Sequence, residues 1–113
     1  MRSSRQGRPH HYRHKIQIDQ RGLDSVSGTE GHPLKVTGAI YDLQPPSAST
    51  LVAIGVWNQY IIEANGPRIQ VTLNGQPVND YQSTREQTGY IALQAHDFLS
   101  RTQFRNLLVR KLP

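Results

Sequence analysis

Cysteine is absent from this chain of 113 residues, which excludes disulfides, thiol catalysis and thiolate metal sites. No apolar run is long enough to span a bilayer, and the basic N-terminus lacks the apolar segment of a signal peptide. No stretch shows a convincing 3.6-residue apolar period over the length of a helix. These absences predict one domain with a modest core, built from strands, with no export signal and no membrane partner.

Acidic residues are scarce at the N-terminus. Residues 1–22 hold six Lys or Arg and a single Asp, which accounts for the whole net charge of +5. Such a segment can touch an anionic surface, but Tyr12 is the only aromatic residue available there for base stacking. We therefore interpret residues 1–11 as a solvated, irregular arm, and we expect no nucleic-acid partner.

The clearest local signal is a β-hairpin over residues 55–75. Asn-Gly pairs at 65–66 and 74–75 supply the positive φ values that short hairpin turns require. Between these turns, residues 68–73 alternate polar and β-branched or leucine side chains, the period of a strand with one wet face. The hairpin predicts that the rest of the chain is further sheet laid beside it.

Shorter alternating patterns predict four more strands, at residues 12–19, 34–41, 89–96 and 102–112. The segments between them are interpreted as loops at 20–33 and 44–49, a polar turn-like stretch at 76–88 and a connector at 97–101. Regularly spaced strands with turn signals between them are typical of an all-β sandwich or barrel. We assign residues 12–113 to that domain.

Six short motifs occur in an order that matches a known family: Q-I-D at 17–19, G-A-I-Y at 38–41, W-N at 57–58, L-N-G at 73–75, G-Y-I-A-L-Q-A-H at 89–96 and F-R-N at 104–106. Together they resemble the C-terminal part of the 3-keto-disaccharide hydrolase family, over nearly all of residues 12–112. The resemblance implies a concanavalin A-like jelly-roll β-sandwich and a carbohydrate ligand. It also implies a periplasmic or extracellular bacterial location, for which this chain carries no signal peptide.

Two departures from the family follow from this resemblance. The family has more strands before the Q-I-D segment, so we expect an incomplete frame that self-associates or takes its missing strands from a partner. The family also usually carries a glutamate two residues before that Gln, where this chain has Lys15. The substitution favours an inactive domain or a non-catalytic, lectin-like binding module over an enzyme.

The family is linked to cleavage of 3-keto-disaccharides. A ketone at C3 acidifies the C2 hydrogen, so a base removes that proton, the enolate expels the glycosidic oxygen at C1, and water adds. The catalytic candidates are Gln17, Asp19 and His96, which we expect to share one polar patch with Tyr90 and Gln94. The alternatives are a loop-capping role for Asp19 and a plain surface role for His96.

The substrate-binding candidates are Lys15, Tyr41, Asn58, Tyr90, Gln94 and Arg105. All except Gln94 have a structural alternative: an edge-strand lysine, cross-strand packing of the tyrosines, a loop contact for Asn58, and an ion pair of Arg105 with Glu63 or Asp19. Trp57 is predicted to lie in the sandwich core.

Histidines at positions 10, 11 and 14 are close enough in sequence to suggest a metal site. Spacing alone is weak evidence for one, so we predict neither a metal nor a cofactor. Three interpretations therefore stay open: a glycoside-cleaving enzyme, a carbohydrate-binding module, and a structural piece that needs a partner.

Overall fold

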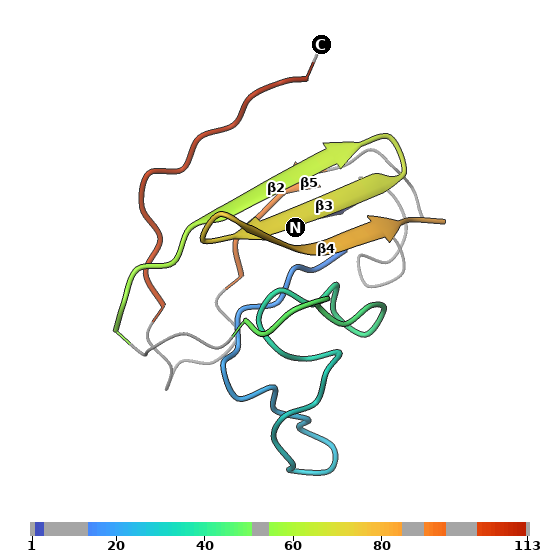
Figure 1. Cartoon of the computed structure of the whole chain (residues 1–113), viewed down its shortest axis with the longest axis vertical. Coiled ribbons are helices and arrows are strands. Elements are labelled where there is room, and N and C mark those ends of the chain that lie inside the picture. The colour runs from blue at the N-terminus through green and yellow to red at the C-terminus, as the bar shows by residue number, and fades with distance from the viewer. Residues whose placement is uncertain (1, 4–13, 51–54, 85–89, 95–101, 113) are drawn as a thin grey trace.

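The computed structural model describes residues 2–3, 14–50, 55–84, 90–94 and 102–112. These residues contain strands and no helix, which confirms the all-β prediction. Three strands, β2 (Tyr60–Asn65), β3 (Arg68–Leu73) and β4 (Gln76–Gln82), form an antiparallel sheet in the order β2-β3-β4 (Figure 1). A second, two-stranded antiparallel sheet joins β1 (Arg2–Ser3) to β5 (Tyr90–Ile91).

The two turns of the larger sheet lie where the Asn-Gly pairs predicted them. Asn74 and Gly75 have φ values of +52° and +82°, the two consecutive left-handed residues of a type I′ hairpin turn. At the other turn Gly66 has φ +57° and is followed by Pro67. Because proline has no backbone N–H, position 67 has no donor that needs a partner. These turns set the register that places Glu63 opposite Gln70, and Gln70 opposite Asp80.

The core lies on one face of this sheet. Along β3 the side chains of Ile69, Val71 and Leu73 are buried and the residues between them are not, as the alternation predicted. Ile40 and Val78 complete the buried cluster, with partly buried hydrophobic side chains packed around it: Ile16, Leu43, Tyr60 and Tyr81. The irregular segment 14–50 therefore covers the apolar face of β3 and β4.

Residues 12–19 and 34–41 were predicted as strands, and this was wrong for the residues described. They pair only through the isolated bridge Ile16↔Ile40 and through backbone hydrogen bonds such as Gln17 N to the Ala39 carbonyl (3.0 Å). Local turns compete with the ladder, because Gly38 has φ +89° and the Ala39 N–H donates to the Val36 carbonyl. Regular strands were predicted here, whereas the structure holds the two segments together by an irregular pairing.

Residues 76–88 were predicted to be a polar turn, whereas residues 76–82 form β4. A bulge between Val71 and Thr72 lets both Val78 and Asn79 be buried, which breaks the two-residue period that marks a strand in sequence. Of the predicted strand over 89–96, Tyr90–Ile91 form β5 and residues 92–94 form no strand, whereas residues 89, 95 and 96 lie outside the described part of the chain.

The C-terminal segment 102–112 carries an alternating pattern but forms no strand. Alternation yields a strand only when a neighbouring strand supplies hydrogen-bond partners, and the described residues supply none here. Trp57 was predicted in the core and is 48% exposed instead, because the residues before β2 lie at the surface. No helix long and apolar enough to cross a membrane is found within the described ranges.

Candidate functional site

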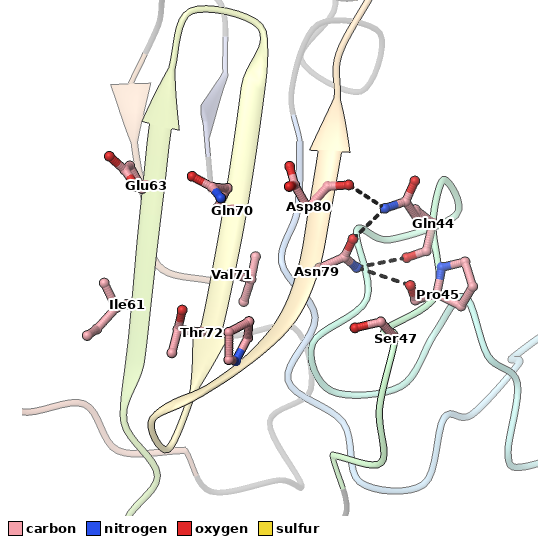
Figure 2. Close-up of a pocket in the computed structure, with 11 residues that line it drawn as sticks. Gln44, Pro45, Ser47, Ile61, Glu63, Gln70, Val71, Thr72, Asn79 and Asp80 are labelled. Carbon is pink, nitrogen blue, oxygen red and sulfur yellow. Dashed lines mark hydrogen bonds between the residues drawn. The ribbon is translucent and has the colours of Figure 1, made fainter.

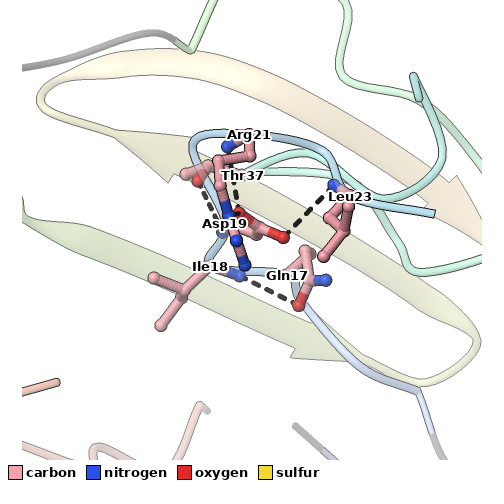
Figure 3. Close-up of polar contacts among 6 residues, drawn as sticks. All are labelled: Gln17, Ile18, Asp19, Arg21, Leu23 and Thr37. Carbon is pink, nitrogen blue, oxygen red and sulfur yellow. Dashed lines mark hydrogen bonds and ion pairs between the residues drawn. The ribbon is translucent and has the colours of Figure 1, made fainter. Parts of the chain in front are cut away.

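Asp19 holds the start of the loop that follows it (Figure 3). Its Oδ1 accepts hydrogen bonds from the backbone N–H of Arg21 (2.9 Å) and from Arg21 Nε (3.4 Å), and its Oδ2 accepts one from the Leu23 N–H (3.3 Å). The Asp19 N–H donates to Thr37 Oγ1 at 2.9 Å. These contacts are those of a loop-capping aspartate, with most of its acceptor capacity used by its own loop.

Gln17 lies beside Asp19, but its carboxamide folds toward its own backbone (Figure 3). Its Oε1 accepts a hydrogen bond from the Ile18 N–H at 3.2 Å. Its backbone carbonyl accepts a hydrogen bond from the Tyr60 hydroxyl. The contacts shown for Gln17 and Asp19 therefore tie the segment 15–19 to its surroundings.

Tyr41 lies between two lysines. Lys15 Nζ is 4.5 Å and Lys35 Nζ 4.6 Å from the centre of its ring, both within cation–π range. Lys35 also donates to Asp42 Oδ1 (2.7 Å) and to the Tyr41 hydroxyl (3.3 Å). The bond to Asp42 raises the pKa of Lys35 above its ordinary value, which favours the charged ammonium of Lys35 beside the ring.

Arg105 lies against Trp57, the residue that precedes Asn58, away from the Asp19 loop in sequence. The Arg105 guanidinium lies 3.9 Å from the centre of the Trp57 ring. Neither Glu63 nor Asp19 pairs with it among the ion pairs of the described residues, so the predicted salt bridge is not formed. Asn58 Oδ1 accepts from Asn74 Nδ2 (3.0 Å), which joins the entry of β2 to the β3–β4 turn.

The remaining candidates are only partly described. Gln94 Oε1 is buried without a hydrogen-bond partner in the structure. His96, His10 and His11 lie outside the described residues, as does the side chain of Tyr90. The predicted polar patch therefore stays a prediction. Within the described ranges no three His, Cys, Asp or Glu side chains are grouped to hold a metal ion.

His14 is buried rather than displayed for a ligand. Its Nε2 lies 2.7 Å from Ser83 Oγ, and its ring centre is 6.0 Å from that of Tyr81. The histidine thus joins segment 14–50 to the residues just after β4.

A hollow of about 340 Å³ lies over the polar face of the larger sheet (Figure 2). Its floor comes from β2, β3 and β4, and one wall is the loop that contains Gln44, Pro45 and Ser47. Gln44 Nε2 fixes this wall by donating to Asn79 Oδ1 (2.7 Å) and to the Asp80 carbonyl (2.9 Å). None of the residues predicted for the site lines this hollow.

Glu63, Gln70 and Asp80 form a row across the floor of the hollow, one from each strand (Figure 2). With its carboxamide oriented to satisfy both neighbours, Gln70 donates to Glu63 Oε2 (3.2 Å) and accepts from Arg68 Nη2 (3.2 Å). Arg68 in turn donates to both carboxylate oxygens of Asp80, at 3.0 and 2.7 Å. Ile61 and Pro77 add apolar surface at the neighbouring level of the floor.

The two carboxylates of the row differ in their partners. The bidentate pair with Arg68 lowers the pKa of Asp80 below its ordinary value, which makes that carboxylate a poor base. Among the described residues Glu63 forms no ion pair: the Arg68 guanidinium is bound to Asp80 and acts on Glu63 only through its charge, and the Gln70 amide donates to Glu63. In the hollow the Asp80 carboxylate is therefore ion-paired with Arg68, whereas the Glu63 carboxylate is not ion-paired with a described residue.

Sequence reasoning did not assign the hollow, although its signal was present. The wet face of residues 68–73 was recognised, and Arg68 and Gln70 belong to it. Glu63 was considered only as a partner for Arg105. Asp80 lies in the stretch 76–88 that was predicted to be a polar turn, because β4 was not recognised as a strand.

The fold and the hollow define an all-β protein with a polar, carboxylate-bearing sheet face beside an irregular loop layer. Compared with family models, the chain matches the 3-keto-alpha-glucoside-1,2-lyase-like domain over residues 1–110. The chain belongs to that family, as the resemblance of its motifs predicted. Searches of curated proteins and of solved structures found no match. Membership of the family supports a glycoside-related function.

Proposed function

We propose that this chain acts on 3-keto-disaccharides and cleaves the glycosidic bond by elimination followed by water addition. A base takes the C2 proton, and the C–H electron pair forms an enolate with the C3 ketone. The enolate collapses to a C1=C2 double bond and expels the glycosidic oxygen, which takes up a proton. Water then adds its hydroxyl to C1 and a proton to C2. The observation that carries this proposal is the family match over residues 1–110.

The hollow over β2, β3 and β4 suits this chemistry best. Glu63 is the proposed base, because its carboxylate lies in the hollow and forms no ion pair among the described residues of one copy, whereas that of Asp80 is held by Arg68. Ile61 and Pro77 offer an apolar surface to the C–H face of a sugar ring, and Gln44 and Gln70 offer amides to its hydroxyls.

A second proposed location is the surface of Lys15, Gln17, Asp19 and Tyr41. Two ammonium groups around Tyr41 favour it, since a cation stabilises a developing enolate oxygen. The three hydrogen bonds that Asp19 accepts from its own loop weigh against it as the site of the base. His96 stays a proposed base or acid for either location.

The alternative function is non-catalytic carbohydrate binding on a jelly-roll frame. The observation that favours it is Lys15, which stands where the family resemblance places a glutamate. A binding module needs the apolar and amide surface of the hollow but no base.

The two functions and the two locations are separated by one set of variants assayed on a 3-keto-disaccharide. We expect cleavage by the unaltered chain and a fall in kcat/KM of about 100-fold or more for Glu63→Gln, the scale of a lost general base. Glu30→Gln, at an exposed loop carboxylate, is the matched control and should retain full activity.

Lys15→Glu restores the carboxylate expected from the family resemblance. An increase in activity with Lys15→Glu, together with an unaffected Glu63→Gln variant, would move the site to the Lys15 surface. Binding of the sugar without turnover in any variant, followed by NMR titration, would establish the binding module and overturn the enzyme. Absence of both binding and turnover would overturn the sugar function altogether.

A further inference from the structure

The two edges of the larger sheet are treated differently. At β4, the Ser47 N–H donates to the Val78 carbonyl (2.7 Å) and Gln44 Nε2 donates to the Asp80 carbonyl, so the loop 44–47 covers this edge. At β2, the only backbone partner strand is β3, which leaves the outer edge open in the part of the chain that the structure describes. An open strand edge is a template for another strand.

In the part of the chain that the structure describes, exposed apolar side chains occur on this edge and in the C-terminal segment, among other places. On β2, Ile61 and Ile62 are 57% and 44% exposed, although they point to opposite faces of the sheet. In the C-terminal segment 107–112, which we name the tail, Leu107, Leu108 and Val109 are 64%, 93% and 82% exposed. The sequence pattern of the tail is that of a strand, but in this structure it has no strand partner among the described residues.

The charges of β2 and the tail are complementary. β2 carries Glu63 and no cation, whereas the tail carries Arg110 and Lys111 and no acid. Opposite charges on neighbouring strands stabilise their pairing, and like charges oppose the pairing of a tail with a tail.

The tail of the same chain is poorly oriented to fill this edge. Arg105 is held on Trp57, just before β2 begins, so a tail continuing along β2 from there runs in the same direction as β2. That arrangement adds a parallel strand to an antiparallel sheet, which is the less stable pairing. Figure 1 shows the tail lying apart from the arrows of the sheet. A second copy has no such constraint and can present its tail antiparallel.

We propose that two copies of this chain associate by exchanging tails, with residues 107–112 of each copy paired antiparallel to β2 of the other. The interface is the same on both copies, so it closes as a two-fold dimer. Each added strand satisfies the open backbone edge of β2 and packs the apolar side chains of the tail against Ile62, which points to the face of the sheet opposite Ile61 and the hollow.

Because the chain has no cysteine, mixing two single-cysteine variants tests the exchange directly. We expect Ile62→Cys mixed with Leu108→Cys to form a disulfide-linked pair under mild oxidation. Val26→Cys, at a loop residue that is 95% exposed, is the matched control and should not cross-link to Leu108→Cys. In a chain carrying both Ile62→Cys and Leu108→Cys, a disulfide within one chain would overturn the proposal.

Sedimentation equilibrium of the unaltered chain and of Leu108→Lys gives a second measurement. Leu108 is 93% exposed in a segment without a strand, so its substitution should not disturb the fold of a single copy, which circular dichroism checks. We expect the unaltered chain to dimerise and Leu108→Lys to weaken the dimer more than about tenfold, from the loss of one buried leucine. Val26→Lys should dimerise normally. A monomer at all concentrations of the unaltered chain would overturn the inference.

Discussion

The hydroxyl of Tyr60 donates a 2.9 Å hydrogen bond to the backbone carbonyl of Gln17. The two residues are 43 positions apart, and the bond fastens the irregular segment 14–50 to the first strand of the larger sheet. Burial raises the pKa of the Tyr60 phenol well above its ordinary value. Tyr60 is therefore a neutral, partly buried link between the two layers of the described fold.

Removing this hydroxyl should loosen the contact between the layers. We expect Tyr60→Phe to lower the free energy of unfolding by about 1 kcal/mol, the usual net worth of one hydrogen bond, in urea denaturation at pH 7. Tyr41→Phe loses only a longer contact of 3.3 Å to Lys35, so it should lower the free energy of unfolding by less. Equal stability of Tyr60→Phe and the unaltered chain would show that the contact contributes nothing.

The raised pKa of Tyr60 also predicts the alkaline limit of stability. The neutral phenol is favoured by the folded state, so this contribution is complete below the unfolded tyrosine pKa of about 10 and is lost as pH rises above it. Between about pH 9 and about pH 11, values that bracket the unfolded pKa, we expect the urea midpoint of the unaltered chain to fall by more than that of Tyr60→Phe. Parallel curves for the two proteins would contradict the assignment.

Gly38 is required for space as well as for its backbone angle. Its φ is +89°, and a Cβ at this position would lie 3.0 Å from Thr50 Cγ2 and 3.3 Å from Val78 Cγ2. Gly31 has nearly the same angle, +81°, but nothing within 4 Å of an added Cβ. We expect Gly38→Ala to cost about 1–3 kcal/mol more than Gly31→Ala in chemical denaturation, because only Gly38→Ala overpacks the core. Equal costs would mean that the backbone angle alone matters.

The Arg68–Asp80 pair predicts a contribution to acid stability. Arg68 lowers the pKa of Asp80, so the stabilisation is present above the unfolded aspartate pKa of about 3.9 and is lost as pH falls through the lower folded pKa. We expect Asp80→Asn to reduce stability at pH 7 and to flatten its decline below about pH 4, measured by urea midpoints. The effect should be small, because both side chains are about half exposed, at 53% and 52%. Glu30→Gln, at an exposed loop carboxylate, serves as the control and should change the stability at pH 7 less than Asp80→Asn does.

Trp57 reports on the C-terminal segment because it is the only tryptophan in the chain. The Arg105 guanidinium covers its ring at 3.9 Å. We expect Arg105→Ala to expose the indole and increase quenching of its fluorescence by acrylamide, whereas Arg110→Ala, further along the same segment, should have no effect. Identical quenching in Arg105→Ala and the unaltered chain would show that the stacking is not maintained in solution.

The hairpin of β2 and β3 was predictable because its signals are local. Asn-Gly pairs set the turns, and the alternation over 68–73 is enough to assign the buried face of β3. β4 was missed for a tertiary reason. Its Asn79 is buried because its amide donates to the carbonyls of Gly38, Gln44 and Pro45, which are 34 or more residues away in sequence. In a sequence, a polar residue with such distant partners looks like a surface residue.

The candidate site, too, was only partly predictable from the sequence. The residues that carry the family resemblance were found from their order, and the family match confirms the family but not their roles. Lys15 and Tyr41 were each proposed to contact the sugar, but the structure is needed to show that they contact each other. The row of Glu63, Gln70 and Asp80 depends on strand register, which no single stretch of sequence contains.

The sequence by itself determined the class of this protein, its family and the two tight turns of its sheet, because turn chemistry and alternation act between neighbouring residues. Only the tertiary structure decided which polar side chains share a surface and which edge of the sheet is covered. Those outcomes depend on contacts between residues far apart in the chain, such as Tyr60 with Gln17 and Gln44 with Asn79. A polar side chain becomes structural or functional according to the partner that packing brings to it.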